Sequence, residues 1–240
     1  MPWDTIYLGC IAFAAGLVQG FSGFGVVLVA LPLMALIIDV KIAIPLVLML
    51  GMVVNIILAM QLARNIEIRE CLPLIVMSLP GIPIGVYTLK VVGPRPLEML
   101  VGIVILLTVG TFLFLKPGAR KLSKGWGWIA GLAAGFLGGS IGAAGPPVII
   151  YTTLQPWAKH KIKSTMVGFF FILGLGIIIT HLISGIITPT VWRYWTICVG
   201  PLALGVLLGI GLYGRSSATI YQRIAMLLLA ILGLLLLLKG

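Results

Sequence analysis

Long apolar runs alternate with short polar connections along this chain and divide it into eight segments. Most runs hold 18 or more residues with few charges, enough for a helix to cross a hydrocarbon core about 30 Å thick. Runs such as LLLAILGLLLLL are continuous, whereas strands of a membrane barrel alternate apolar and polar residues. The pattern predicts an all-α integral membrane protein with segments at 6–38, 42–63, 71–92, 97–115, 126–154, 162–185, 194–213 and 219–238.

The two halves of the chain show an internal repeat of about 120 residues. Three glycines recur 119 residues later, in the pairs Gly16 and Gly135, Gly20 and Gly139, and Gly23 and Gly142. Four further residues recur 120 later: Lys41 as Lys161, Ile66 as Ile186, Gly85 as Gly205 and Arg95 as Arg215. We therefore predict two membrane repeats, 1–120 and 121–240, in a single membrane domain. Each consists of one Gly-rich segment and three plainer helices.

The Gly-rich segment that opens each half is too long for one straight helix. Residues 6–38 would form a helix of about 50 Å at 1.5 Å per residue, well beyond the thickness of the core. Its middle reads QGFSGFG, and the matching segment reads GGSIGAAGPP, both rich in residues that break helices. Each segment is therefore predicted to be two short helices joined by a non-helical turn within the membrane.

The positive charges distinguish two topologies. If each Gly-rich segment crosses the membrane once, the 16 Lys and Arg divide eight to eight. If each segment returns to its starting side, eleven lie on one face, and Lys41, Lys90, Arg95, Arg193 and Lys239 lie on the other. Because Lys and Arg concentrate on the cytoplasmic side, the sequence favours returning, re-entrant segments. A returning segment plus three crossings inverts the second repeat, as in many secondary transporters. Eight single crossings with parallel repeats remain the alternative.

Composition agrees with a membrane protein and narrows its chemistry. Hydrophobic residues make up 61% of the chain and charged residues 9%, whereas a soluble domain carries about a quarter charged residues. The net charge of +11 is explained by connections that orient spans and contact anionic lipid, so nucleic acid is not required as a partner. The isolated Cys10, Cys71 and Cys198 give no disulfide or metal pattern, and no cofactor is predicted. No basic leader with a cleavage site opens the chain, so we expect no removable signal peptide.

The Gly-rich segments resemble the sulfite exporter TauE/SafE family, also called the 4-toluenesulfonate uptake permease family. GFSGFGVVLVALPL and GGSIGAAGPPVIIYTTL look like the twin signatures of that family, and the resemblance covers essentially the whole chain. It implies a multi-pass protein of the bacterial or archaeal inner membrane that moves small anions, chiefly sulfite and organosulfonates. Phe24 and Val26 stand where more glycine is common in the family, which makes the second turn the better candidate for substrate approach.

Backbone donors at the two turns are the candidate anion site. The first turn of a helix offers unpaired N–H groups and a positive dipole end, and glycine lets an oxyanion approach them. Each residue type also has an alternative, structural role. The glycines could allow tight helix packing, the serines could bond to their own helix, and Asn55 could pair with a neighbouring helix instead of a turn. The candidate substrate-binding residues are Gln19, Ser22, Gly23, Gly25, Asn55, Gly139, Ser140, Gly142, Gly145 and Pro146.

Ionisable residues are scarce within the apolar segments. His181 is the only histidine inside one, which makes it a candidate for proton coupling, with ordinary hydrogen bonding as the alternative. Lys41 and Lys161 begin corresponding spans, and either attract anions into two vestibules or act as interfacial anchors. All five carboxylates lie in or near connections, so a carboxylate-based proton route is not evident.

The leading hypothesis is a secondary transporter or permease for a small sulfur-containing anion. The alternatives are a transporter of another small organic acid anion and a membrane subunit without its own flux. An enzyme is not expected, because no nucleophile is paired with a base and no metal-ligand spacing appears. Homo-oligomer formation is left open. Leucine at Gly145 should abolish transport, whereas leucine at Gly233, in the last apolar run, should be tolerated.

Overall fold

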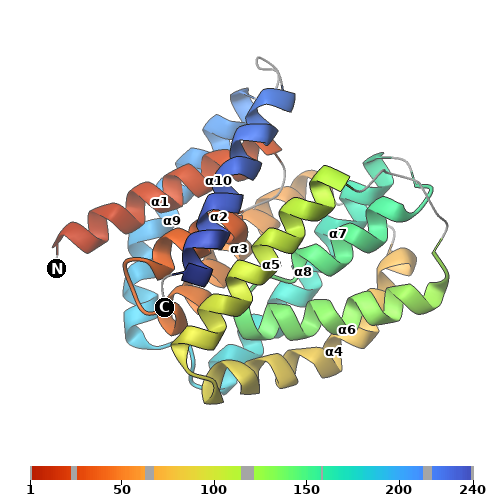
Figure 1. The fold of residues 1–240 in the computed structure, drawn as a ribbon, viewed down its shortest axis with the longest axis horizontal. Helices are drawn as coiled ribbons and strands as arrows, with labels where there is room; N and C mark the ends of the chain where they lie inside the picture. Colours follow the sequence, from red (N-terminus) through yellow and green to blue (C-terminus); the bar gives the residue numbers. More distant parts are fainter. Residues whose placement is uncertain are drawn as a thin grey trace. The chain divides into compact units, whose positions relative to one another are not determined.

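The computed structural model describes residues 2–22, 26–62, 68–114, 122–157, 159–212 and 218–238, and in these ranges it is helical, without strands (Figure 1). The prediction of an all-α protein is confirmed. The helices are α1 (Pro2–Ser22), α2 (Val26–Ala35), α3 (Val40–Leu62), α4 (Ile68–Val91), α5 (Pro94–Phe114), α6 (Lys124–Ile141), α7 (Gly145–Leu154), α8 (Lys159–Ile183), α9 (Pro189–Leu212) and α10 (Ala218–Leu238).

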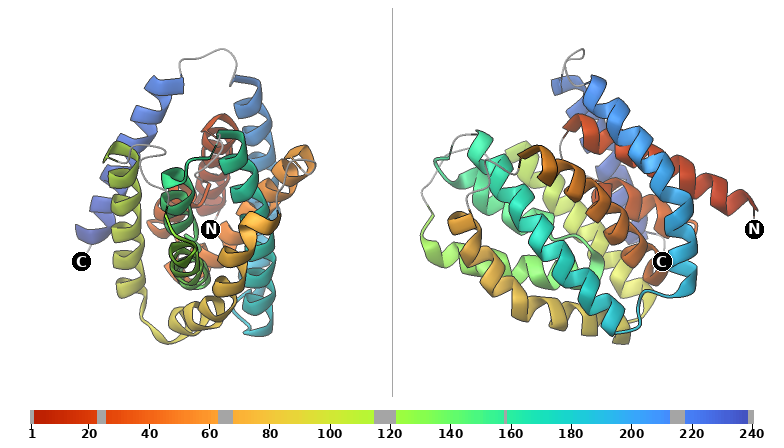
Figure 2. Two further views of the ribbon diagram at one scale, coloured as in Figure 1. Left: turned by 90° about the vertical axis from the view of Figure 1, so that its right-hand side faces the viewer. Right: turned by 180° about the vertical axis from the view of Figure 1, so that it is seen from behind.

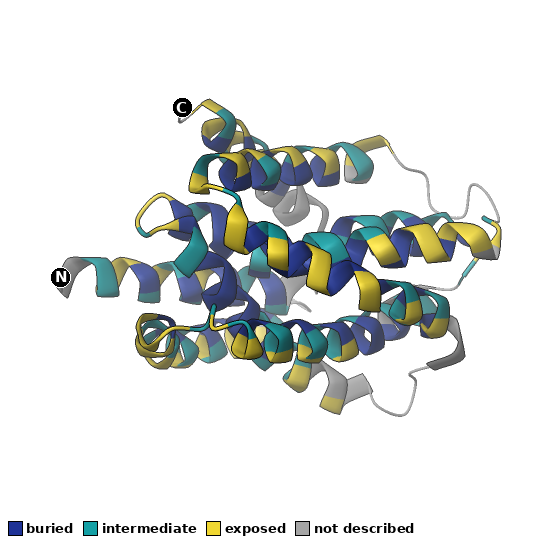
Figure 3. Cartoon of the chain, turned by 90° about the horizontal axis from the view of Figure 1, so that it is seen from below, coloured by how far each residue is buried: buried dark blue, intermediate teal, exposed yellow. Residues whose placement is uncertain are grey.

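The predicted segments correspond to these helices with small shifts at their ends. Each plain span is one helix, and each Gly-rich segment is two, α1 with α2 and α6 with α7. Five helices in the described ranges are long and apolar enough to cross a membrane, over Val40–Ile57, Cys71–Val91, Pro94–Thr111, Ser164–Ile183 and Pro189–Gly211. Asp4–Gly20, Val26–Ala35 and Met226–Leu238 are shorter apolar helices. Large apolar residues such as Leu79, Leu204 and Leu227 are exposed, which suits a lipid surface. Figure 3 shows exposed positions, in yellow, recurring along the helices.

The chain forms two compact units that do not coincide with its two halves. Unit 1 comprises Met1–Val54, Gly93–Val109 and Gly185–Gly240, and unit 2 comprises Asn55–Val92 and Gly110–Ser184. Each unit therefore contains helices from both halves of the sequence. The division into repeats at residue 120 concerns duplication of the sequence, and it stays a prediction.

A row of glycines joins α6 to α4 in unit 2, where the two helices lie side by side (Figures 1 and 2). A Cβ atom added at Gly135 would overlap the carbonyl oxygen of Ser78, and one at Gly139 would lie 2.6 Å from that of Ile82. The backbones are in direct contact, which only glycine permits. The contacting residue numbers rise together on both helices, so α4 and α6 run in the same direction.

The same packing joins α1 to α9 in unit 1. Gly16 and Gly20 of α1 lie against the carbonyl oxygens of Leu202 and Val206 of α9, and again both numbers rise together. By the sequence repeat α1 corresponds to α6 and α9 to α4. Each leading helix therefore packs against the corresponding helix of the other half.

These contacts correct one detail of the repeat. Gly205 packs on the carbonyl of Phe13, and Gly81 packs on that of Leu132, which lies 119 residues after Phe13. Gly205 is therefore the structural counterpart of Gly81, an offset of 124, and not of Gly85. Four residues make about one helical turn, so both alignments place glycine on the same helix face, and the sequence did not distinguish them.

Two polar contacts in unit 2 fix the direction of α8. Near the starts of the two helices, Cys71 Sγ of α4 donates to the Thr165 carbonyl of α8 at 3.3 Å. Near their ends, Lys90 Nζ donates to the Ser184 carbonyl just after α8 at 2.9 Å. Both pairs are 94 residues apart, so α4 and α8 run parallel.

In unit 1, α5 and α10 run in opposite directions. Arg95, at the start of α5, contacts Leu236 and Leu237 at the end of α10, and further along α5 Gly102 packs against Gly233. A Cβ atom at Gly233 would lie 3.2 Å from the carbonyl oxygen of Gly102. Gly233 therefore packs against α5, where an added side chain requires these neighbours to shift by a few tenths of an ångström, and the expectation that leucine is tolerated there stays a prediction.

Candidate functional site

The turn between α6 and α7 is defined by a left-handed glycine and two prolines. Gly142 has φ of 72°, and the N–H groups of Gly142 and Ala143 donate to the carbonyls of Gly138 and Leu137. The bond from Gly142 to Gly138 is that of the αL cap, in which glycine is favoured because φ is positive. Helix α7 begins at Gly145 with prolines in its first turn, and Gly142 to Ala144 are buried. The predicted break of the second Gly-rich segment is confirmed.

The start of α7 has backbone donors without a side-chain cap. Ala144 is the N-cap residue and makes no side-chain capping bond. Pro146 and Pro147 have no N–H, and the N–H of Val148 closes the first turn of the helix on the Ala144 carbonyl, so the N–H groups left without a helical partner are those of Ala144 and Gly145. A Cβ at Gly145 would meet only side-chain atoms, Ile149 Cδ1 at 3.6 Å and Phe170 Cζ at 4.0 Å. The backbone at Gly145 is therefore approachable, unlike that at Gly139.

His181 lies on α8 against the end of α6. Its ring is fully buried, and Nε2 is 3.1 Å from the carbonyl oxygen of Gly139. Because a carbonyl only accepts, Nε2 carries the hydrogen in this bond. Nδ1 is buried, and it has no hydrogen-bond partner among the described residues. One turn earlier on α8, Ile177 lies beside Gly138, where an added Cβ would be 2.6 Å from Ile177 Cδ1 and 3.1 Å from Ala144 Cβ. Helix α8 thus lines the break.

Two predicted substrate residues next to this turn have local partners. Ser140 Oγ donates to the Phe136 carbonyl at 2.8 Å, the bond to its own helix that was the alternative to anion binding. Gly139 packs against Ile82 and Val86 of α4, which is the packing alternative. Gly142, Gly145 and Pro146 therefore belong to one turn, His181 bonds to Gly139 near the end of the helix that leads into it, and Ser140 and Gly139 have structural contacts.

The first half differs from the second in that a side chain caps the helix that follows its break. Gln19 is buried, and its Oε1 accepts a 2.9 Å bond from the N–H of Val26, the first residue of α2. The residue 119 positions later is Gly138, which has no side chain, so α7 lacks this cap. Ser22 ends α1. The side chain of Ser22 and the residues Gly23 and Gly25 lie outside the described part of the chain.

The remaining candidates occupy helix starts or the middle of α3. The backbone N–H of Lys41 donates to Asp39 Oδ1 at 2.7 Å, so Asp39 caps α3. Lys161 Nζ lies 5.3 Å from the ring centroid of Trp157, a cation–π contact that suits an interfacial anchor. Asn55 is half-buried in α3. Their roles in binding stay predictions.

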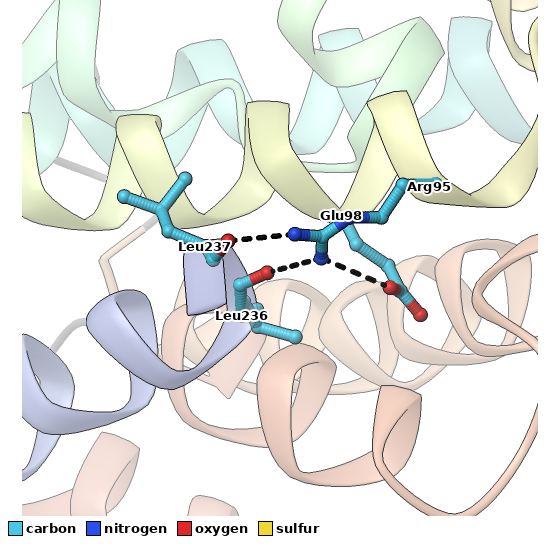
Figure 4. A network of polar contacts seen from close by, with 4 residues as sticks. All are labelled: Arg95, Glu98, Leu236 and Leu237. Atoms are coloured by element: carbon cyan, nitrogen blue, oxygen red, sulfur yellow. Dashed lines mark hydrogen bonds and ion pairs between the residues drawn. The ribbon is translucent and has the colours of Figure 1, made fainter. Parts of the chain in front are cut away.

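Sequence reasoning missed two basic clamps at helix ends. Arg95 donates to the carbonyls of Leu236 at 2.7 Å and Leu237 at 2.6 Å, and lies 3.8 Å from Glu98 (Figure 4). Lys90 similarly caps the end of α8 at Ser184. From the sequence, Arg95 and Lys90 are identified only as positive charges in the connections between spans. The available signal was their position at a span end, where a basic side chain reaches free helix carbonyls.

The described residues hold no group of three His, Cys, Asp or Glu side chains that could bind a metal ion. The donors at the α6–α7 turn are instead backbone N–H groups in a buried, apolar setting. Broken apolar helices with buried donors, together with several long apolar helices, define a multi-pass membrane protein of the transporter class.

Comparison with known families agrees with this class. The family model described as sulfite exporter TauE/SafE matches residues 8–236, nearly the whole chain. The protein therefore belongs to the TauE/SafE family of membrane transporters, and the predicted resemblance is confirmed. No match was found among curated proteins or among solved structures.

Proposed function

We propose that this protein is a secondary transporter that moves a small sulfur-containing anion, such as sulfite or an organosulfonate, across the bacterial or archaeal inner membrane. The observation that carries the proposal is the α6–α7 turn in a chain of the TauE/SafE family. A buried helix start without a side-chain cap offers N–H groups and the positive dipole end to an oxyanion. Gly145 leaves the backbone approachable, and Gly142 fixes the turn.

The helix directions support a re-entrant α6–α7 hairpin. Since α4 runs parallel to both α6 and α8, α6 and α8 run in the same direction. A chain cannot pass twice in one direction through a membrane without returning in between. In this proposal α7, the helix between them, begins that return, and the turn lies within the membrane.

The same directions favour inverted repeats over eight single crossings. In the inverted arrangement α4 and α8 cross in the same direction, and α5 and α10 cross in opposite directions, as their contacts require. Eight successive crossings would instead run α4 opposite to α8 and α5 parallel to α10. The proposed topology also places Lys90 and Arg95 on the side with five positive charges, which is the outer side.

The test is an anion panel in liposomes that contain only this protein. Flux of sulfite, thiosulfate, sulfate, sulfoacetate, taurine and acetate is measured for the wild type, and sulfite or a sulfonate should move fastest. Acetate as the only transported anion would identify an organic acid transporter. An absence of flux for the whole panel, with the protein correctly inserted, would indicate a membrane subunit without its own transport and refute the proposal.

A further inference from the structure

We propose that His181 is the proton-binding residue of the anion site, so that one proton accompanies each singly charged anion and the transport step carries no net charge. The inference rests on the proposed transport function and deepens it. It starts from a residue that is fully buried, has one nitrogen bonded to the end of α6, and has the other nitrogen without a partner among the described residues.

The position of His181 follows from the direction of its helix. Ile177, one turn before it, contacts the position of Gly138 and lies near Ala144 of the turn. Because α6 and α8 run in the same direction, one further turn along α8 reaches the level at which α6 ends and the turn toward α7 starts. The bond from Nε2 to Gly139 places the ring at that level.

The protonation state of the ring then depends on what else is bound. With Nε2–H committed to Gly139, a neutral His181 presents Nδ1 as a buried acceptor. Adding a proton there creates a buried cation with a second N–H and no described acceptor, which is costly without a counter-ion. An anion at the start of α7 supplies both the opposite charge and the acceptor. Proton and anion therefore bind together.

The ionisable residues of the surrounding helices do not supply the counter-ion for a protonated His181, so the anion has this role. On α4, the ionisable residues nearest the end of α8 are Tyr87 and Lys90, and both are exposed. Lys90 is bonded to the Ser184 carbonyl, and its positive charge also disfavours a lone proton on His181. Glu70 is the acidic residue of α4, and its position in the helix is at the opposite end, about 24 Å along the parallel helices. The remaining ionisable residues of α4, α6, α7 and α8 lie toward that opposite end: Arg69, Cys71, Lys124, Tyr151, Lys159, His160, Lys161 and Lys163.

Electrical behaviour distinguishes this role from a structural one. A carrier that moves an anion alone responds to membrane potential, and 100 mV changes the equilibrium accumulation of a single charge about 50-fold. A carrier that moves the anion with a proton does not respond to potential at equal pH. His181→Gln keeps an N–H for the Gly139 carbonyl and cannot take up the proton, so it should convert the neutral step into a charged one.

The experiment measures sulfite accumulation in liposomes in mildly acidic buffer, where singly charged hydrogen sulfite predominates. The pH is equal on both sides, and potassium with valinomycin sets the potential. Wild-type accumulation should be unchanged by a 100 mV potential, whereas accumulation by His181→Gln should change up to about 50-fold. Wild-type accumulation that follows the potential overturns the inference while leaving transport intact. No sulfite movement in the wild type overturns the transport proposal for this anion and the inference together.

A binding measurement covers the case in which His181→Gln is inactive. Calorimetry of sulfite binding in two buffers of different ionisation enthalpy gives the number of protons taken up per anion. The wild type should take up one proton, and His181→Gln should take up none while still binding sulfite. Equal proton uptake by the two proteins, or none by the wild type, overturns the assignment.

Discussion

Glycine has two different roles in the second Gly-rich segment, and its nearest neighbours separate them. Gly135 and Gly139 face the backbone of α4, whereas Gly145 faces only the ends of side chains. The first kind allows helices to touch, and the second leaves the donors at the start of α7 accessible. Both kinds look alike in the sequence, because glycine indicates close approach without indicating whether a helix or a ligand approaches.

Gly145→Leu should therefore abolish transport while the protein remains in the membrane at near-normal amount. The added side chain fills the space beside the donors, but it meets no backbone that would force the helices apart. Sulfite flux at matched expression is the measurement. Gly200→Leu is the control, because Gly200 is exposed on α9 with no atom within 4 Å of an added Cβ. Equal flux in both variants would show that Gly145 has no part in transport.

Gln19 should contribute to stability as the cap of α2. Gln19→Leu removes the oxygen that accepts from Val26 while keeping most of the volume, and should cost about 1 kcal/mol, the usual value of an N-terminal cap. Gln19→Glu keeps an oxygen in place and should retain the cap. Thermal unfolding of both variants in detergent measures the difference. A Leu variant as stable as the wild type would refute the capping role.

Side-chain partners were the least predictable part of the site. Gln19 and Ser140 were expected near an anion because they are polar residues in apolar runs, yet the first caps a helix and the second bonds to its own helix. His181 was correctly singled out, but its bond to Gly139 joins residues 42 apart on two helices. Such a pairing depends on how the helices pack, which the local sequence does not specify.

At the scale of helices, the glycine contacts between α4 and α6 should tolerate no side chain. Gly135→Ala places a Cβ against the Ser78 carbonyl, and the helices must separate along their length to make room. Overpacking of this kind costs about 1–3 kcal/mol. Folded yield and unfolding temperature should fall, whereas Gly110→Ala in α5, where an added Cβ meets no atom within 4 Å, should be neutral. A neutral Gly135→Ala would mean that the two helices are less close than described.

The Arg95 clamp should hold the end of α10 against α5. Arg95→Leu leaves the Leu236 and Leu237 carbonyls without this donor and should lower stability by about 1–2 kcal/mol, a range reduced because the side chain is 36% exposed. Arg95→Lys keeps one donor in place of a fork and should recover only part of the loss. Unfolding in detergent compares the three proteins. Complete rescue by lysine would show that charge alone matters.

The helices themselves could be predicted closely, because apolar length and helix breakers are local properties. The span expected at 42–63 is α3 at Val40–Leu62, and the break expected within GGSIGAAGPP falls at Gly142 to Ala144. Their pairing could not be predicted. Nothing local in α1 indicates that its glycines meet α9, since the partner is chosen by the fit of two surfaces from opposite halves.

For the whole molecule, the decisive prediction concerns the side of the membrane on which each connection lies. The inverted topology places Ser123 in the cytoplasm and both Gly93 and Thr188 outside, whereas eight single crossings place Ser123 and Thr188 on one side and Gly93 on the other. The contact between Lys90 and Ser184 already brings the neighbourhoods of Gly93 and Thr188 to the same ends of α4 and α8.

Single cysteines at Ser123, Gly93 and Thr188, in a protein whose three native cysteines are replaced, allow this to be measured. A membrane-impermeant maleimide applied to right-side-out vesicles should label Gly93→Cys and Thr188→Cys, and should label Ser123→Cys only after the vesicles are opened. Position 123 is exposed, so failure to label after opening would reflect misfolding and would be visible as lost flux. Labelling of Ser123→Cys and Thr188→Cys from the same side would refute the re-entrant α6–α7 hairpin, because this hairpin adds the extra return that separates these two positions.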